Sequence, residues 1–345
     1  MIELVKQKHS LFFPLWVILF SFVLCQQTDI KQFVEEIPIV PIPLDGPAAE
    51  SRAEFSGLAW FGEYLIMLPQ YPERYGNHFF IIHQDSLRGF LQSGSSSTVT
   101  PTPLPVNMPD FSSIIPGYEG FEAIDFYHDR VFITIESEAG SGVMGYLITG
   151  TVSPGFTDID LDVNSLRKIP PQTHLPNFSE ESLIIVDNTV CTIYEINSSE
   201  LNKHSVMHTF SIDGNSSGTI PFPSIEYRIT DTTRPDHNNR FWVINYLWPG
   251  DGDDLNVVED PLFQKYGKGS SHSSSKTVER LIQLEYTSNG IILTESPPIL
   301  LQLEKGQSRN WEGIVRFQDV GFLLVTDKYP KTILAFVPYA MNDQR

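Results

Sequence analysis

The hydrophobic positions of this chain fall in short runs, alternating or continuous, that are separated by turn residues. Stripes with the spacing of an amphipathic helix are scarce, and the chain holds 25 Pro and 23 Gly, residues that end strands and form turns. Such a pattern predicts an all-β fold. Apolar residues make up 41% of the chain, which is enough for a sizeable core.

One pattern recurs along the chain. An acidic residue opens a first strand, a tight polar turn follows, and a second, more hydrophobic strand ends in polar residues. The copies begin at Glu54, Glu119, Glu181, Asp231 and Glu312. Their starts are 65, 62, 50 and 81 residues apart, and further strands fit between them. A hairpin repeated at such intervals is typical of the blades of a β-propeller.

We therefore predict a single β-propeller domain over residues 26–345, with five blades, and with six as the alternative. The widest interval also holds two polar stretches, 249–261 and 267–276, which we interpret as surface insertions. The segment "IPIVPIPL" (37–44) precedes the first copy. We expect this N-terminal strand to complete the last blade and close the ring, because closure removes the exposed sheet edges that invite aggregation.

The first 25 residues have the form of a targeting segment. Lys6 and Lys8 precede an apolar run, 11–24, which contains a proline and is shorter than the ~20 residues of a membrane span. A cleaved signal peptide is predicted for residues 1–25, so the mature protein would be secreted or periplasmic, without a membrane span. Lipidation of Cys25 is the alternative, disfavoured by the bulky Leu24 before it.

The charge of the chain disfavours some classes of binding partner. It has 42 acidic and 23 basic residues, a net charge of −19 at pH 7. Such a field repels nucleic acid and anionic membranes and favours cations. After cleavage only Cys191 would remain of two cysteines, which excludes a disulfide framework and a cysteine zinc cluster. We expect a monomer. Asn177, Asn197 and Asn215 each lie in an N-x-Ser sequon, the acceptor site for N-glycosylation if the host is eukaryotic.

The acids that open the repeats are candidate metal ligands. In a propeller the first strand of each blade starts, and the second ends, at one mouth of the central channel. Carboxylates gathered there would repel one another unless a cation neutralises them. Calcium accepts carboxylate and amide oxygens in flexible geometry, whereas zinc prefers imidazole or thiolate. The predicted calcium ligands are Glu54, Glu119, Glu181, Asp231, Asn245, Glu312 and Asp327.

The same rule brings Gln70, Glu136 and either Glu195 or Asn197 to this mouth, because they end second strands. A second interpretation needs no metal. An acid that opens an inner strand can instead hydrogen-bond the backbone of the neighbouring blade. The sequence leaves both interpretations open.

Arginines accompany the opening acids. Arg binds phosphate or carboxylate through two parallel hydrogen bonds, so these side chains would suit a small anionic or ester substrate bound across the mouth. Surface ion pairs that contribute little are the alternative. The predicted substrate-binding residues are Arg52, Arg228, Arg234, Arg309 and Trp311.

The stretches "EFSGLAW", "YEGFEAI", "NWEGIV" and "GFLLVTDKYP" resemble the secreted β-propeller family described as having the esterase-like activity of phytase. Calcium-dependent apyrases, gluconolactonase-type lactonases and strictosidine-synthase-like proteins are similar in pattern. The resemblance implies a calcium-supported hydrolase of esters or phosphoesters, with Glu119 and Glu312 at the Glu-Gly positions. The chain departs from the family at Ser182, where glycine is expected, and at Asp231, which lacks the Glu-Gly pair.

Two functions follow as hypotheses. In the first, a secreted hydrolase uses calcium to polarise a carbonyl or phosphoryl oxygen, and Glu119 or Glu312 accepts a proton from water. In the second, a non-catalytic extracellular propeller binds a sugar, peptide or protein at an aromatic-rich mouth. The aromatic residues of that mouth would be Tyr71, Tyr118, Tyr246, Trp248, Trp311 and Tyr329.

Overall fold

The computed structural model describes residues 34–94, 97–140, 142–252 and 254–340. They belong to one unit of the chain, Phe33–Arg345. The predicted signal peptide and Cys25 lie outside the described residues. Among the helices within those ranges, none is long and apolar enough to cross a membrane.

The described chain is all-β, as predicted, and its strands follow one another in up-and-down runs. The first two runs are β3 (Phe55–Phe61), β4 (Tyr64–Pro69), β5 (His78–His83) and β6 (Thr102–Asn107), then β7 (Tyr118–Tyr127), β8 (Arg130–Ala139), β9 (Gly142–Val152) and β10 (Ile159–Ile169). The third is β11 (Glu180–Val186), β12 (Thr189–Tyr194), β13 (Val206–Ser211) and β14 (Ser217–Pro221).

The last two runs each recruit a strand from the start of the described chain. The fourth is β15 (Arg228–Thr232), β16 (Arg240–Leu247), β17 (Val278–Thr287), β18 (Gly290–Leu293) and β19 (Ile299–Leu301), joined by β1 (Glu36–Ile37). The fifth is β20 (Trp311–Phe317), β21 (Gly321–Thr326) and β22 (Leu334–Pro338), joined by β2 (Val40–Ile42).

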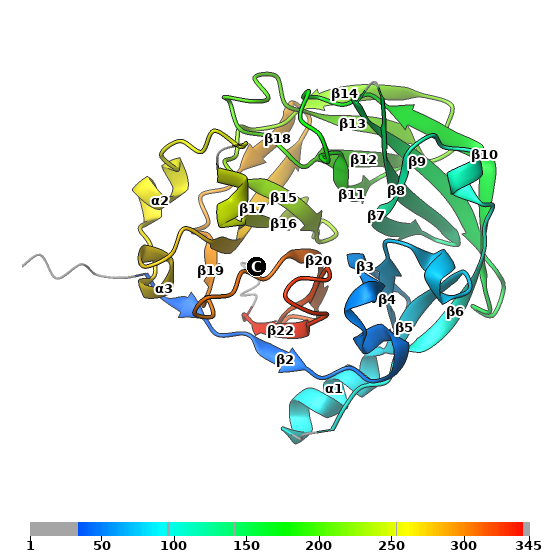
Figure 1. Ribbon diagram of the computed structural model, residues 1–345, viewed down its shortest axis with the longest axis horizontal. Helices are drawn as coiled ribbons and strands as arrows, with labels where there is room; N and C mark the ends of the chain where they lie inside the picture. Colours follow the sequence, from blue (N-terminus) through cyan, green and yellow to red (C-terminus); the bar gives the residue numbers. More distant parts are fainter. Residues whose placement is uncertain (1–33, 95–96, 141, 253, 341–345) are drawn as a thin grey trace, which may run out of the picture. The chain divides into compact units, whose positions relative to one another are not determined.

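The first strands of the five runs form the inner wall of a closed ring. β3 packs on β7, β7 on β11, β11 on β15, β15 on β20, and β20 again on β3. Figure 1 shows these strands around a common centre. The propeller fold is therefore confirmed. Because β6 pairs in parallel with β10, the first two runs share one eight-stranded sheet, and the expected number of five blades stays a prediction.

The predicted ring closure is confirmed. β2 pairs antiparallel with β22, with Val40 opposite Phe336 and Ile42 opposite Leu334. Pro41 lies in this outermost strand, where a residue without an N–H is tolerated. The N-terminal segment also does something the sequence did not indicate, because β1 pairs in parallel with β19 of the preceding sheet.

Helices are few and lie outside the ring wall (Figure 1). They are α1 (Gln84–Ser93), α2 (Pro261–Tyr266) and α3 (Ser270–Ser273), with 3-10 turns η1 (Gly46–Ala49), η2 (Ser51–Ala53), η3 (Pro72–Tyr75), η4 (Phe111–Ser113) and η5 (Pro249–Gly252). The helix α1 buries Leu87 against the sheets, and His83 caps its start by accepting the Asp85 amide. Thus η5 lies in the first predicted insertion and α3 in the second, while α2 lies between the two.

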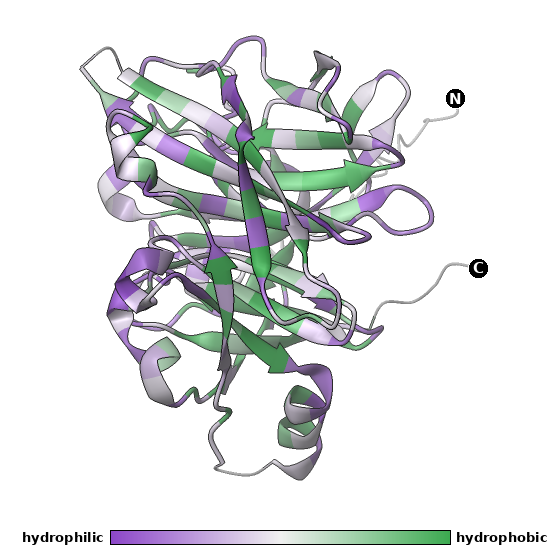
Figure 2. Ribbon diagram, turned by 90° about the vertical axis from the view of Figure 1, so that its right-hand side faces the viewer, coloured by the Kyte–Doolittle hydropathy of each residue, from purple (hydrophilic) through white to green (hydrophobic). Residues whose placement is uncertain are grey.

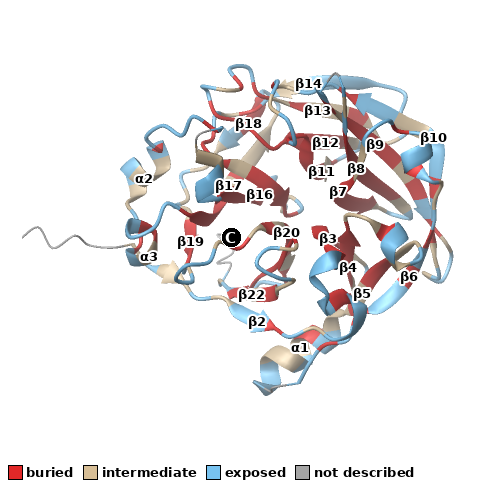
Figure 3. Ribbon diagram, viewed as in Figure 1, coloured by how far each residue is buried: buried red, intermediate tan, exposed pale blue. Residues whose placement is uncertain are grey.

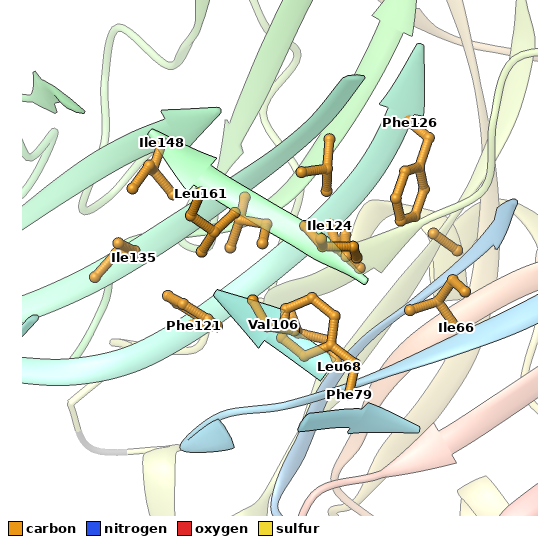
Figure 4. Packing of buried hydrophobic residues seen from close by; sticks show 14 of the residues in the cluster. Ile66, Leu68, Phe79, Val106, Phe121, Ile124, Phe126, Ile135, Ile148 and Leu161 are labelled. Atoms are coloured by element: carbon orange, nitrogen blue, oxygen red, sulfur yellow. The ribbon is translucent and has the colours of Figure 1, made fainter. Parts of the chain in front are cut away.

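The core lies between neighbouring sheets. One cluster joins the first two runs through Phe79, Phe121, Ile135, Ile148 and Leu161, and Figure 4 shows their side chains gathered between the strands. Figure 3 shows the inner strands buried and the outer loops exposed, and Figure 2 shows apolar and polar positions alternating along strands. Burying each such side chain contributes about 1.5–3 kcal/mol, so this packing holds the inner strands in place.

Candidate functional site

A cavity of about 700 Å³ opens where the inner hairpins begin and end. Its polar lining is rich in carboxyl groups, and it comes from all five runs. The lining residues with carboxyl, amide or cationic side chains are Gln70, Glu122, Glu136, Asn177, Glu181, Arg228, Gln307, Asn310, Glu312, Asp327 and Lys328. Residues far apart in the sequence therefore contribute to one site.

A β-bulge lies at the same point of each inner hairpin, one or more residues into its first strand. A bulged residue has no partner in the ladder, and the bulge redirects its side chain. In β7, β11 and β20 the bulged residue is the opening acid of the repeat, Glu119, Glu181 and Glu312. In β3 it is Ser56, so Glu54 does not occupy the equivalent position.

Arg228 stands among these acids. Its guanidinium pairs with Glu195, which is fully buried, and lies 3.6 Å from Asp251 and 3.7 Å from Glu312. The ring of Tyr246 lies 5.7 Å from the guanidinium carbon. This arginine therefore offsets part of the negative charge of the site.

The pKa values of the carboxyls reflect their crowding. Burial, with the charges of Glu136 and Glu312, raises the pKa of Glu122 well above its ordinary value. Burial has the same effect on the pKa of Glu181, reinforced by Glu122 and Glu195. For Glu312, burial and the charge of Asp327 raise the pKa well above the ordinary value. These groups hold protons at pH values where an exposed glutamate has lost its own.

Two other acids titrate near neutrality. Burial and the charge of Glu195 raise the pKa of Glu136 to about 7. Burial raises the pKa of Glu195 to about 7, although Arg228 acts in the opposite direction. Both groups also have a buried oxygen, Oε2, without a hydrogen-bond partner among the described residues. Such an atom costs free energy until a ligand, a proton or water satisfies it.

The remaining hydrogen bonds fix the orientation of the wall. Gln70 Nε2 donates to Glu122 Oε1 at 3.1 Å. Asn310 Nδ2 donates to Glu312 and, at 3.3 Å, to Asp327. Two amides thus hold three carboxyls from different strands.

The site was compared with the requirements of a metal ion. Among the described residues, no three Asp, Glu, His or Cys side chains already stand together as a metal site. The side-chain atoms of the cavity wall that can bind a metal ion are carboxyl and amide oxygens, with no imidazole or thiolate among the lining residues of the described chain. Together with the unpaired oxygen of Glu136, this donor set fits a hard cation such as calcium and does not fit zinc.

Of the seven predicted calcium ligands, the wall holds Glu181, Glu312 and Asp327. Glu54 lies beside it, 2.5 Å from Arg74 and 3.1 Å from Lys328. Glu119 does not line the cavity; its side chain accepts a hydrogen bond from the Tyr71 hydroxyl at 3.5 Å. The pattern that selected Glu54 could not locate the bulge at Ser56, and the bulged Glu119 nevertheless stays outside the cavity lining.

Asp231 and Asn245 hydrogen-bond backbone instead of lining the cavity. The buried Asp231 carboxyl accepts the Ile314 amide of the neighbouring inner strand at 2.6 Å. Asn245 Nδ2 donates to the Arg228 carbonyl at 3.0 Å, and its Oδ1 accepts from Arg280 Nε at 2.7 Å. For these two residues the structure has the metal-free arrangement.

Among the predicted substrate-binding residues, Arg228 lines the cavity. Arg52 is exposed and pairs with Glu50. Arg234 lies in a separate cavity of about 180 Å³, where it pairs with Asp125 at 2.5 Å. Arg234 follows the end of β15, so it belongs to the opposite end of the inner strands.

Arg309 and Trp311 lie in the wall behind the cavity. Both side chains donate to Glu279 Oε2, at 2.7 Å from Arg309 Nη2 and 2.8 Å from Trp311 Nε1. Trp311 is fully buried. These residues support the start of β20 and do not reach the cavity surface.

Glu122 was missed as a site residue, although it lies in the first strand of its repeat. A second register shift, between Phe121 and Ile124, redirects this part of β7. Its signal in the sequence was a second charge inside an apolar strand. Glu136 was indicated by the rule for second-strand ends, which needs no knowledge of the bulges.

The chain was compared with known proteins. No family model matches it, so membership of the phytase-like family stays a prediction. No curated protein matches it either.

Solved structures resemble it at low identity. They include a glycosyl hydrolase from Bacteroides ovatus (12% identity, TM-score 0.45, 89% of this chain and 95% of that one) and an α-L-arabinanase from Cellvibrio cellulosa (9%, 0.44, 82% and 90%). A luciferin-regenerating enzyme is also similar (9%, 0.40, 88% and 97%).

Proposed function

We propose that this chain hydrolyses an ester or a phosphoester in the carboxyl-lined cavity, with the support of calcium. One observation carries the proposal. Glu122, Glu136, Glu181, Glu312 and Asp327 come from three hairpins and line one cavity of about 700 Å³ beside an arginine. A protein pays for such a cluster of like charges in stability, and clusters of this kind concentrate at functional sites.

The proposed calcium ligands are chosen from the wall. They are Glu122, Glu136, Glu181, Glu312 and Asp327, so the set keeps three of the residues expected from sequence and omits Glu54, Glu119, Asp231 and Asn245. A bound calcium ion would act as a Lewis acid on the carbonyl or phosphoryl oxygen. The predicted export of the chain agrees with a site for this ion.

Glu312 is the proposed proton acceptor. It is held by Asn310, and it lies 3.7 Å from the Arg228 guanidinium. Burial and the charge of Asp327 raise the pKa of Glu312, so its carboxylate is a stronger base than that of an exposed glutamate. Arg228 and Lys328, both in the wall, are proposed to bind the anionic part of the substrate.

A non-catalytic propeller that binds a ligand at the same mouth is the second candidate. The observation that favours it is aromatic: Tyr246, Trp248 and Tyr329 all line the cavity. Saturable binding without turnover, unaffected by a chelator, would select this candidate over the hydrolase.

The test uses the mature chain with phenyl acetate and phenyl phosphate as substrates. We expect turnover that a calcium chelator removes and added calcium restores, and a rise in the melting temperature with calcium. Glu312→Gln should lower kcat by at least about 100-fold, because the amide cannot accept the proton. It should also reduce the calcium-dependent rise in melting temperature.

Glu295→Gln is the matched control, since Glu295 is 90% exposed and pairs with Lys265 away from the cavity. This variant should behave like the unmodified protein. Turnover that persists in chelator, or a Glu312→Gln protein as active as the control, would exclude the proposed mechanism.

A further inference from the structure

Two aromatic side chains at the cavity are exposed. Trp248 is 51% and Tyr329 61% exposed, whereas the other exposed large hydrophobic residues of the described chain are aliphatic. Both rings line the carboxyl-lined cavity, although Trp248 follows β16 and Tyr329 follows β21. Exposed aromatic surface costs free energy in water, so two such rings gathered from two loops at one cavity indicate a ligand that covers them.

The indole of Trp248 lies against the backbone of Gly250. A Cβ added at Gly250 would lie 2.1 Å from Cζ3 and 2.2 Å from Cη2 of this ring. The backbone of Gly250 does not have the left-handed φ that favours glycine, so its conformation does not require one. The absence of a side chain at Gly250 instead lets the indole pack on the backbone. The six-membered ring of the indole is thereby held against Gly250, while the residue stays 51% exposed.

The same loop connects the indole to the charged part of the site. The Asp251 amide donates to the Trp248 carbonyl at 3.0 Å. The Asp251 carboxylate lies 3.6 Å from the Arg228 guanidinium. A ligand bound to Arg228 is therefore next to the loop that holds the indole. The site thus pairs a cation that suits an anionic group with a flat apolar surface that suits a ring.

We propose that Trp248 is a specificity-determining residue on which a ring of the substrate stacks, while Arg228 binds its anionic group. The substrate class is an anionic ester, either a phosphoester or an ester that also carries a carboxylate, with an aromatic or sugar ring that offers an apolar face. Turnover of such a substrate would depend on the proposed hydrolase function. Binding of its ring to Trp248 does not depend on that function. Stacking of a ring on an aromatic side chain typically changes affinity by about one order of magnitude or more.

The binding test needs no turnover. Calorimetric titration of the protein compares phenylphosphonate, glucose 1-phosphate and methylphosphonate, which share an anionic group and differ in the ring. We expect at least one ring ligand to bind about tenfold more tightly than methylphosphonate. Which of the two rings is preferred identifies the aromatic or the sugar class. No preference for either ring over the methyl group would overturn the inference.

Variants assign the preference to the indole. Trp248→Ala should remove it and leave methylphosphonate binding unchanged. Gly250→Ala should weaken it although the indole remains, because the new methyl group displaces the ring. Ile292→Ala is the control, since Ile292 is 48% exposed on β18, outside the cavity, and the preference should persist. A preference that survives Trp248→Ala would overturn the inference.

The two proposals fail separately. Ring-selective binding without any hydrolysis would exclude the hydrolase and support the stacking role of Trp248. Hydrolysis of methyl and phenyl esters at equal kcat/KM, together with equal binding of all three ligands, would support the hydrolase and exclude the stacking role.

Discussion

Glu136 shows how one side chain can control the stability of the whole domain. It lies in the cavity wall, with one oxygen unpaired, and burial and Glu195 raise its pKa to about 7. The unfolded chain releases the same proton near pH 4.5. Between these values the folded state binds more protons than the unfolded state, so the free energy of unfolding falls as the pH rises.

The first prediction concerns this pH range. Without calcium, the free energy of unfolding should fall from about pH 4.5 to about pH 7, and Glu136→Gln should remove up to about 3 kcal/mol of that fall. Urea unfolding in chelator at the two ends of the range measures it. Glu295→Gln should keep the full dependence. If Glu136→Gln keeps it as well, the carboxyl does not titrate as the structure indicates.

The residues found and missed share a physical cause. The sequence identifies which residue is charged, but a shift of one position in a strand moves its side chain to the opposite face. The bulge in β3 lies at Ser56, so Glu54 was aligned with the wrong position, and Glu122 was missed because a second shift in β7 lies between Phe121 and Ile124. Arg234 was misplaced for a related reason, since closeness to Asp231 in sequence does not tell which end of β15 it follows.

At the scale of elements, the inner strands approach so closely that some positions exclude a side chain. Gly313 in β20 lies against β3, and an added Cβ would be 2.8 Å from Leu58 Cγ and 2.6 Å from Val325 Cγ1. It directly follows the bulged Glu312. The same contact therefore determines the spacing of two inner strands and the position of a proposed ligand.

Gly313→Ala should destabilise the fold by about 1–3 kcal/mol, because the methyl group overpacks this contact. Gly89→Ala is the matched control in α1. A Cβ there meets nothing within 4 Å, so alanine should stabilise the helix by about 0.5–1 kcal/mol. Denaturant unfolding of both variants gives the two signs. Equal effects would contradict the close approach of β20 and β3.

The hairpins were the most predictable elements. Their apolar strands and polar turns repeat at long intervals, and four of the five predicted copies coincide with an antiparallel pair of strands. The copy predicted from Asp231 was set too late, because β15 begins at Arg228 and Asp231 lies near its end. The pairing of β6 with β10 and of β1 with β19 was not predictable, since it joins backbone edges that carry no distinctive side chains. Pairing between edges depends on which strands the ring brings together.

At the scale of the whole molecule, the ring is held by a junction of its two chain ends. β2 forms the outermost strand of the last sheet and covers the edge of β22. Ile42 is buried there in the cluster that also contains Leu334. The N-terminal strand therefore stabilises a sheet whose other strands all lie near the C-terminus.

Removal of residues 1–44 should uncover the β22 edge, so its amides should exchange with solvent faster and the protein should self-associate. Hydrogen exchange of residues 334–338 and size-exclusion chromatography measure the two effects. Removal of residues 1–33 leaves β1 and β2 and is the control. Unchanged exchange in the longer deletion would show that β2 does not protect this edge.

The pairing of Val40 with Phe336 also sets a timetable for biosynthesis. The ribosome makes the first of these residues nearly a whole chain before the second, which is roughly 15–60 seconds at about 5–20 residues per second. Throughout that interval the sheets already synthesised can fold, but the ring cannot close. The last step of folding is then the long-range pairing of β2 with β22. Conditions that delay this pairing would leave an open intermediate that is prone to aggregate.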